Sequence, residues 1–193
     1  MRIIAGAYRS RILKAPPGLA TRPTSDRLRE TLFNVLAPSI EGAAFLDLYA
    51  GSGAVGLEAL SRGAASVTFV EREPAALKVL RANLAALGVR GGFEVHAGSV
   101  TAYLRSSTKT TPRPRPHAVV FLDPPYDAAQ EYETVLGLLG ATLAPILASG
   151  AVVVAEHRRK QRLEDSYGRL RRTRLLEQGD ASLSFYAKDH GNT

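Results

Sequence analysis

The chain has 193 residues, of which 45% are hydrophobic, and it contains no cysteine. A chain of this size buries most of its unfolded surface without covalent staples, so we expect a globular fold. The lack of cysteine excludes disulfides, thiol nucleophiles and cysteine metal ligands, and it favours a reducing, cytoplasmic setting. No apolar run is long enough to span a bilayer, and the basic N-terminal stretch lacks the apolar core of a signal peptide.

The net charge of +7 is distributed unevenly along the chain. Residues 1–40 hold seven Arg or Lys and two acids, and residues 157–176 hold eight Arg or Lys and two acids, so the remaining residues are net acidic. This pattern favours a polyanion held at the rim of a neutral-to-acidic pocket. The alternative is a charge that serves solubility alone.

Hydrophobic periodicity and turn residues predict an α/β fold. In chain order the predicted elements begin with an N-terminal hairpin or short extension over 2–14, a helix from 25 to about 36 that ends before Pro38, a strand over 45–48, a helix over 54–62, a strand over 66–70 and a helix over 74–87. Strands over 93–97 and 118–122 follow, with a polar surface loop over 106–116 between them, and then a strand over 151–155 and an edge strand over 182–187. Alternating strands and helices predict a mostly parallel, seven-stranded sheet with helices on both faces. We expect an extension over 1–40 and a main domain over 41–190.

A glycine-rich turn follows the first strand of the main domain. Gly51, Gly53 and Gly56 fit the GxGxxG pattern, which by itself is typical of dinucleotide sites. Asp47 lies just before the turn, where a carboxylate repels a pyrophosphate but suits a ligand with an ammonium and a sulfonium group. Glu71 closes the second strand and can accept hydrogen bonds from both ribose hydroxyls. Together these residues favour S-adenosylmethionine; the alternatives are a nicotinamide dinucleotide and a plain strand–helix turn with a capping acid.

A second motif, Asp123-Pro124-Pro125-Tyr126, ends the apolar strand over 118–122. The prolines stop the strand and fix the backbone at the same sheet edge as the glycine turn. An exocyclic base amine is a poor nucleophile, and the Asp123 carboxylate and the Pro124 carbonyl could each accept one of its N–H bonds. Tyr126 offers a ring on which an extruded base could stack. The motif therefore predicts methyl transfer to a base amine; the alternative is an ordinary strand-ending turn.

These two motifs, in this order, resemble amino-methyltransferases with a (D/N)PP(Y/F) signature. From about residue 2 to residue 188 the chain also resembles the bacterial RsmD family, the 16S ribosomal RNA guanine-N2 methyltransferases. The segments that carry this resemblance are 2–6, 8–11, 22–34, 57–64 and 179–186. The block over 22–34, RPTSDRLRETLFN, is the most specific of them.

The resemblance implies a class I methyltransferase (Rossmann-like) fold, S-adenosylmethionine as cofactor, and one guanine of 16S rRNA in the small ribosomal subunit or its assembly intermediate as substrate. The implied catalytic motif is the tetrapeptide at 123–126. The implied cofactor contacts, to which we add Arg72 beside Glu71, are Asp47, Tyr49, Ala50, Gly51, Ser52, Gly53, Glu71, Arg72 and Ser99. Ser99 departs from the family, because many members carry an acidic or amide residue there.

Basic residues near the N-terminus are candidates for holding RNA phosphates, namely Arg9, Arg11, Lys14 and Arg22. Arg22 and Thr24 are also expected near the pocket mouth. The alternative for these residues is a solvated basic face. A second basic run lies over 158–162, and its alternative interpretation is a solvated helix. His117 and His157 are expected to pack or cap, since the histidines have no metal-ligand spacing.

Three other functions compete with the rRNA hypothesis. A DNA adenine-N6 methyltransferase would use the same tetrapeptide, but it would need a target-recognition domain for which this chain leaves little room. A non-catalytic RNA-binding module would be expected to have lost Asp123 or the glycines. A nicotinamide-dependent oxidoreductase lacks hydride-site residues here. We expect a cytoplasmic monomer that uses no metal and no membrane.

Overall fold

The computed structural model describes residues 1–15, 25–107, 115–125, 129–142 and 146–188. The five helices in these residues are α1 (Asp26–Ile40), α2 (Ala54–Ser61), α3 (Pro74–Leu87), α4 (Val100–Ser107) and α5 (Ala129–Thr142). The eight strands are β1 (Ala44–Leu48), β2 (Ser66–Glu71), β3 (Phe93–Ala97), β4 (His117–Leu122), β5 (Leu147–Arg158), β6 (Ser166–Tyr167), β7 (Leu170–Gln178) and β8 (Ala181–Lys188). No helix in the described ranges combines the length and the apolar character that a membrane span requires.

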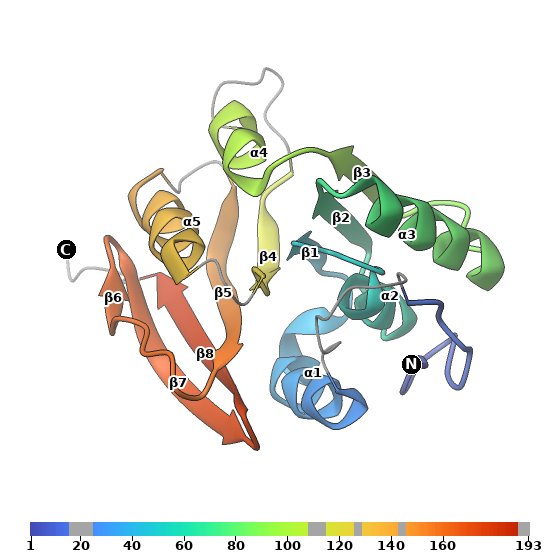
Figure 1. Cartoon of the computed structure of the whole chain (residues 1–193), viewed down its shortest axis with the longest axis horizontal. Helices are drawn as coiled ribbons and strands as arrows, with labels where there is room; N and C mark the ends of the chain where they lie inside the picture. The colour runs from blue at the N-terminus through green and yellow to red at the C-terminus, as the bar shows by residue number, and fades with distance from the viewer. Residues whose placement is uncertain (16–24, 108–114, 126–128, 143–145, 189–193) are drawn as a thin grey trace.

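All eight strands form one sheet in the order β3-β2-β1-β4-β5-β8-β7-β6. Strands β3, β2, β1, β4 and β5 pair in parallel. At the other side of the sheet, β8, β7 and β6 follow β5 and pair in antiparallel fashion (Figure 1). The strand order reverses between β1 and β4, because the chain leaves β1 toward β2 and β3 and returns to β4 on the other side. In open parallel sheets ligands bind at such a switch point, beyond the carboxyl ends of the strands.

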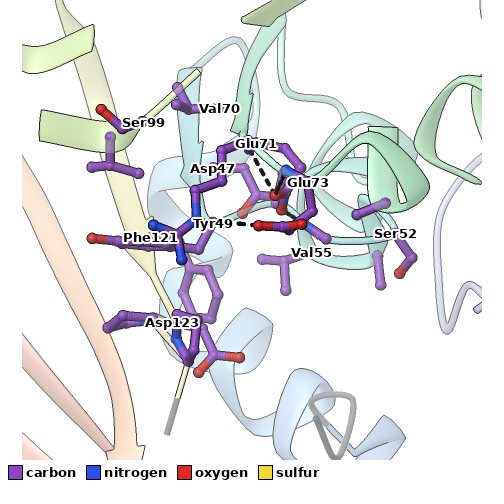
Figure 2. Close-up of a pocket in the computed structure, with 18 of the residues that line it drawn as sticks. Asp47, Tyr49, Ser52, Val55, Val70, Glu71, Glu73, Ser99, Phe121 and Asp123 are labelled. Atoms are coloured by element: carbon purple, nitrogen blue, oxygen red, sulfur yellow. Dashed lines mark hydrogen bonds and ion pairs between the residues drawn. The ribbon is translucent and has the colours of Figure 1, made fainter. Parts of the chain in front are cut away.

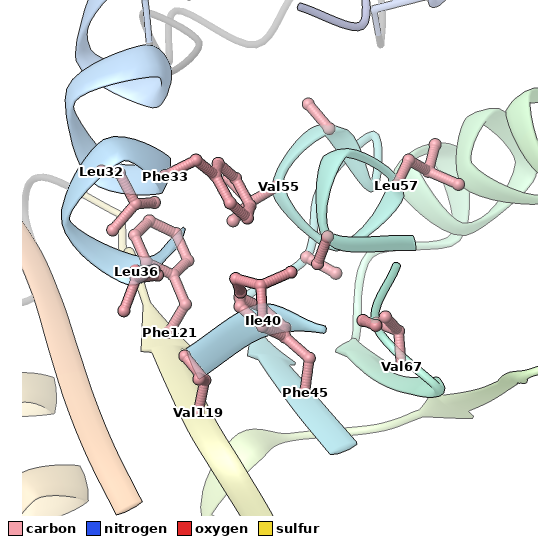
Figure 3. Packing of buried hydrophobic residues seen from close by; sticks show 14 of the residues in the cluster. Leu32, Phe33, Leu36, Ile40, Phe45, Val55, Leu57, Val67, Val119 and Phe121 are labelled. Carbon is pink, nitrogen blue, oxygen red and sulfur yellow. The ribbon is translucent and has the colours of Figure 1, made fainter. Parts of the chain in front are cut away.

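Helices cover both faces of the sheet, as expected. Helices α1, α2 and α3 pack on one face and α4 and α5 on the other (Figure 1). Side chains along each strand alternate between the two cores, so Phe45 belongs to the first and Leu46 to the second. Figure 3 shows the first core, where Phe33 of α1 stacks on Phe45 of β1 with ring centroids 6.3 Å apart.

The sheet has eight strands, so the predicted count of seven is wrong. β6 has two residues, and β7 (LRRTRLLEQ) buries only its first residue fully, so neither shows a clear apolar alternation. The amphipathic helices α4 and α5 were also missed. Ser106 and Ser107 belong to α4 rather than to the predicted loop, of which residues 108–114 lie outside the described part of the chain.

The N-terminal segment agrees with its prediction, whereas α1 runs past its predicted end. Residues 2–14 turn back on themselves as a short extension with a single antiparallel bridge, between Arg2 and Ile12. Helix α1 continues through Pro38 to Ile40. Ile40 follows Leu36 by one turn and is buried with it, so apolar burial extends the helix past the proline. The division of the chain into an extension over 1–40 and a main domain over 41–190 remains a prediction.

Buried polar contacts hold the N-terminal segment against the helices. The Glu58 carboxylate accepts hydrogen bonds from the backbone N–H groups of Ile4 (2.8 Å) and Ala5 (3.0 Å). It also pairs with the fully buried Arg29, whose Nε lies 3.7 Å from Glu58 Oε2. Asn83 of α3 donates to the carbonyls of both Lys14 and Ser52, each at 3.0 Å. The segment is thereby fixed beside the glycine turn.

Candidate active site

A cavity of about 420 Å³ lies at the switch point, beyond the carboxyl ends of β1, β2 and β4. The glycine turn forms one wall, and Asp123 and Pro124 form another. Figure 2 shows Asp47, Glu71 and Asp123 gathered around this space. The structure therefore brings both sequence motifs to one site.

The turn after β1 needs residues that tolerate positive φ. Tyr49 has φ +64°, Gly51 +56° and Gly53 +80°. A Cβ on Gly56 would lie 2.3 Å from the Phe69 ring of β2, so glycine lets α2 approach the sheet. The Asp47 carboxylate accepts a hydrogen bond from the Gly56 N–H at 2.9 Å and so fixes the start of α2.

Glu71, at the end of β2, closes the turn from the opposite side. Its Oε2 accepts a hydrogen bond from the Gly51 N–H at 2.8 Å. Its Oε1 accepts from the N–H groups of Arg72 (2.7 Å) and Glu73 (2.8 Å). These backbone donors hold the carboxylate at the edge of the cavity in a defined orientation.

Burial and mutual repulsion shape the protonation of the site. Burial raises the pKa of Asp47 to about 7, although the Gly56 N–H opposes the shift, and the nearby Glu71 charge adds to it. Burial also raises the pKa of Asp123 well above its ordinary value, and the charges of Glu156 and Asp47 raise it further. The unliganded site thus disfavours the full set of negative charges, which a cationic ligand would stabilise.

Helix α5 contributes a residue that the sequence analysis missed. The Tyr49 hydroxyl donates a hydrogen bond to Glu131 Oε2 at 2.5 Å, so α5 is tied across the cavity to the glycine turn. Burial is the main cause of the raised pKa of Tyr49, and the hydrogen bond to Glu131 raises it further. No sequence motif marks Glu131, and the helix that carries it was not predicted.

Most of the predicted cofactor and catalytic residues line the cavity. They are Asp47, Tyr49, Ala50, Gly51, Ser52, Glu71, Arg72, Ser99, Asp123, Pro124 and Pro125. Gly53 lies behind the lining, where an added Cβ would lie 2.3 Å from the Leu80 side chain. Ser99 Oγ accepts a hydrogen bond from the Ala102 N–H at 3.2 Å, near the start of α4. Tyr126 lies outside the described residues. The sequence analysis did not name the apolar wall of Val70, Ala76, Val100 and Phe121.

The predicted phosphate-binding residues differ in their surroundings. Arg9 is exposed, and Arg11 donates a hydrogen bond to the Ala86 carbonyl at 2.9 Å. The Lys14 side chain is exposed. Arg22 and Thr24 lie outside the described residues. The second basic run is not a helix: Arg158 ends β5, and a turn follows it.

The two histidines flanking strands are packed in the core, as predicted. His117 contacts Thr68 Oγ1 and His157 contacts Ser184 Oγ, at 3.3 and 2.9 Å. Burial lowers the pKa of both. In the described part of the chain, no three His, Cys, Asp or Glu side chains are grouped as metal ligands would be.

The lining fits S-adenosylmethionine in charge and polarity. Five carboxylates border the cavity, and Arg72 is the one basic side chain among its described lining residues. Asp47 and Glu71 would favour the ammonium and sulfonium charges and the ribose hydroxyls, and the apolar wall would suit an adenine ring. A pyrophosphate would meet repulsion at the same place.

Comparison with known proteins places the chain in a family. The model described as "Conserved hypothetical protein 95" matches residues 1–187. YlbH of Bacillus subtilis, whose name proposes an rRNA methyltransferase, is 36% identical over 188 residues, which are 97% of this chain and 99% of YlbH. Ribosomal RNA small subunit methyltransferase D of Escherichia coli is 44% identical over 135 residues, which are 70% of this chain and 65% of the relative.

Solved structures show the same fold. The Escherichia coli protein yhhF, described as a proposed methyltransferase, has a TM-score of 0.84 at 35% identity, with 98% of each chain covered. An RNA methyltransferase from Salinibacter ruber, solved with S-adenosyl-L-homocysteine, has a TM-score of 0.64 at 17% identity, covering 89% of this chain and 96% of that one. The chain belongs to the Conserved hypothetical protein 95 family, that of the RsmD proteins, and has the class I S-adenosylmethionine-dependent methyltransferase fold.

Proposed function

We propose that this chain transfers a methyl group from S-adenosylmethionine to the exocyclic N2 amine of a guanine in 16S rRNA. The observation that carries the proposal is the shared cavity: Asp123, at the end of β4, borders the same acidic space as Gly51 and Glu71. A base amine held by Asp123 would face a methyl donor seated against the glycine turn. The names of the relatives support the ribosomal substrate.

Asp123 and Pro124 would hold the amine. The Asp123 carboxylate would accept one N–H of the amine, and the backbone carbonyl of Pro124 would accept the other. Proline has no backbone N–H that could compete as a donor. These contacts orient the nitrogen lone pair and raise its electron density. When bound, S-adenosylmethionine supplies a sulfonium methyl that the nitrogen takes while the sulfur leaves as a thioether. The amine then loses a proton, and the raised pKa of Asp123 suits it to accept that proton.

The cofactor would be held by residues of β1, β2 and the turn between β1 and α2. Glu71 would accept from the ribose hydroxyls while Gly51 and the neighbouring N–H groups keep it oriented. Asp47 would stabilise the positive charge of the ligand through the cavity. Tyr126 stays a prediction for base stacking.

The test offers labelled S-adenosylmethionine with small ribosomal subunits, free rRNA and duplex DNA in separate reactions. The RNA or DNA is then digested to nucleosides, and the labelled nucleoside is identified. We expect N2-methylguanosine from the small subunit or its RNA. Label in N6-methyladenosine from DNA would replace this proposal with the alternative enzyme, and no label in any substrate would reject it.

A further inference from the structure

A second cavity lies at the end of β5, the strand that pairs with β4. Its volume is about 1230 Å³. It is bordered by the end of β5, the turn that follows, the β7–β8 connection and the start of α1. Figure 1 shows α1 and the β7–β8 hairpin on either side of the end of β5. None of the described residues that line the first cavity lines this one.

Glu156 lies at the inner end of the second cavity. In the sheet, Phe121 of β4 pairs with Val154 of β5, and both belong to the core on the α1 face. Asp123 follows Phe121 by two residues and Glu156 follows Val154 by two, so their side chains project to the same face of the sheet. Glu156 is 3% exposed. Register therefore places two carboxylates side by side on neighbouring strand ends.

The charges of the two carboxylates interact directly. After burial, the charge of Glu156 is the largest cause of the raised pKa of Asp123, ahead of Asp47. Asp123 borders the first cavity and Glu156 borders the second. Register thus places a carboxylate that borders the first cavity beside one that borders the second.

The outer rim of the second cavity is basic. Its described lining holds the cations Arg158, Arg159, Lys160, Arg162 and Arg172, which outnumber the rim acids Glu177 and Asp180. Two of these have acidic partners, since Arg159 pairs with Glu177 at 3.1 Å and Arg172 pairs with Asp165. Lys160 and Arg162 are exposed and have no ion-pair partner among the described residues. The cavity therefore runs from a cationic mouth to an acidic inner end.

We propose that the second cavity receives the substrate strand, with its phosphates at Lys160 and Arg162 and the base edge of the target guanine at Glu156. This inference rests on the proposed function and adds the place where RNA enters and the residue that selects the base. Cations at an exposed mouth hold phosphates without reading sequence. The inner carboxylate would read the base that Asp123 presents to the methyl donor.

The chemistry of the bases explains the selection. Guanine carries a ring N–H at N1 next to its exocyclic amine, and both are donors. Adenine and cytosine carry an acceptor nitrogen beside theirs. A carboxylate at Glu156 accepts from guanine N1–H and repels an acceptor nitrogen at the same place, because two acceptors cannot share a hydrogen bond. Paired carboxylates at 123 and 156 thus suit guanine and disfavour adenine.

The test compares two synthetic RNAs that differ at the methylated position alone. One carries guanine, and the other carries 2-aminopurine, which keeps the exocyclic amine but has an acceptor at N1. Their relative affinities are measured by competition in the presence of S-adenosylhomocysteine, so no turnover is needed. The wild-type protein should prefer guanine by about tenfold or more. Glu156→Gln should reduce that preference to about threefold or less, since an amide can donate to the acceptor.

Two variants serve as controls for this comparison. Glu177→Gln changes an exposed carboxyl at the rim of the same cavity and should keep the guanine preference. Glu156→Asp keeps the negative charge and should retain most of it, which separates base reading from a packing defect. A Glu156→Gln protein that keeps the full guanine preference would overturn the proposal, as would equal binding of both RNAs by the wild type. If either result is found but the wild-type protein still methylates rRNA, the role of Glu156 is wrong and the proposed function stands.

The rim is tested separately by Lys160→Glu combined with Arg162→Glu. This variant should weaken binding of both RNAs by about tenfold or more and should lower the dependence of affinity on salt. Unchanged affinity and unchanged salt dependence would mean that this basic turn is solvated and that the strand enters elsewhere.

Discussion

Asp123 lies just past the end of β4, where burial and the charges of Glu156 and Asp47 raise its pKa. Asp123→Ala removes the acceptor for the amine but leaves the glycine turn and Glu71 intact. We expect methyl transfer to fall by about 100-fold or more. Affinity for S-adenosylhomocysteine, measured by calorimetry, should change by about threefold or less.

The matched control for Asp123 is Glu94→Ala, which removes an exposed carboxyl on β3. It should leave both transfer and cofactor affinity near wild-type values. An Asp123→Ala protein that methylates its RNA at the normal rate would show that the catalytic assignment is wrong.

Asp47 makes stability depend on pH. Its pKa rises from 3.8 to about 7 on folding. The folded state therefore holds a proton that the unfolded state releases, so the stabilising effect of this proton is complete below pH 3.8 and is lost as pH rises through about 7. The loss is on the order of 4 kcal/mol at most.

Asp47→Asn should remove this contribution. Without ligand, the free energy of unfolding of the wild type should fall relative to that of the variant as pH rises from about 4 to 7. Denaturant unfolding at several pH values measures the difference. Parallel pH profiles for the two proteins would contradict the shift assigned to Asp47.

At the scale of elements, the sequence predicts the central units well and the margins poorly. Helix α3 was predicted with its observed bounds because Pro74 suits its first turn, leucines recur on one stripe, and Gly88 ends it in a left-handed conformation. Helix α5 was missed although Tyr132 and Val135 of this helix are buried, since no capping residue was recognised in its sequence. Pro38 gave a false stop: the helix includes it although proline donates no backbone hydrogen bond, and Ile40 beyond it is buried with the rest of the apolar stripe.

Gly56 tests how closely α2 packs on β2. A Cβ there would lie 2.3 Å from Phe69 Cε1 and 2.8 Å from Val67 Cγ1. Gly56→Ala should therefore destabilise the protein by about 1–3 kcal/mol and weaken cofactor binding, because α2 carries the end of the turn.

Gly91→Ala is the matched control for Gly56, because nothing lies within 4 Å of the added Cβ and its φ is not positive. Its stability, measured by denaturant unfolding, should stay within about 0.5 kcal/mol of the wild type. Equal stability of the two variants would mean that α2 does not need the close approach.

At the scale of the whole molecule, the sequence could predict the residues that follow parallel strands. Asp47, Glu71 and Asp123 each stand at or just past a strand end, so their meeting at one edge follows from topology. Glu131 could not be found in this way, because it reaches the cavity from an unpredicted helix. Glu156 directly follows the predicted strand over 151–155, so the same rule applies to it, but the sequence analysis did not single it out.

The N-terminal arginines give a prediction for the RNA-binding surface. Charge reversal of Arg9 and Arg11 together should weaken binding of small-subunit RNA and flatten its salt dependence, since each phosphate contact contributes to the slope. The control is Arg90→Glu, an exposed cation after α3. If affinity and salt slope stay at wild-type values, the RNA surface does not include this segment.

A crystal structure with S-adenosylhomocysteine bound tests the central claim most directly. The account predicts that the ligand lies against the turn at Gly51, with its ribose at Glu71 and its sulfur facing the Asp123 carboxylate across a space wide enough for one base. A ligand bound elsewhere, or with its sulfur turned away from Asp123, would contradict it.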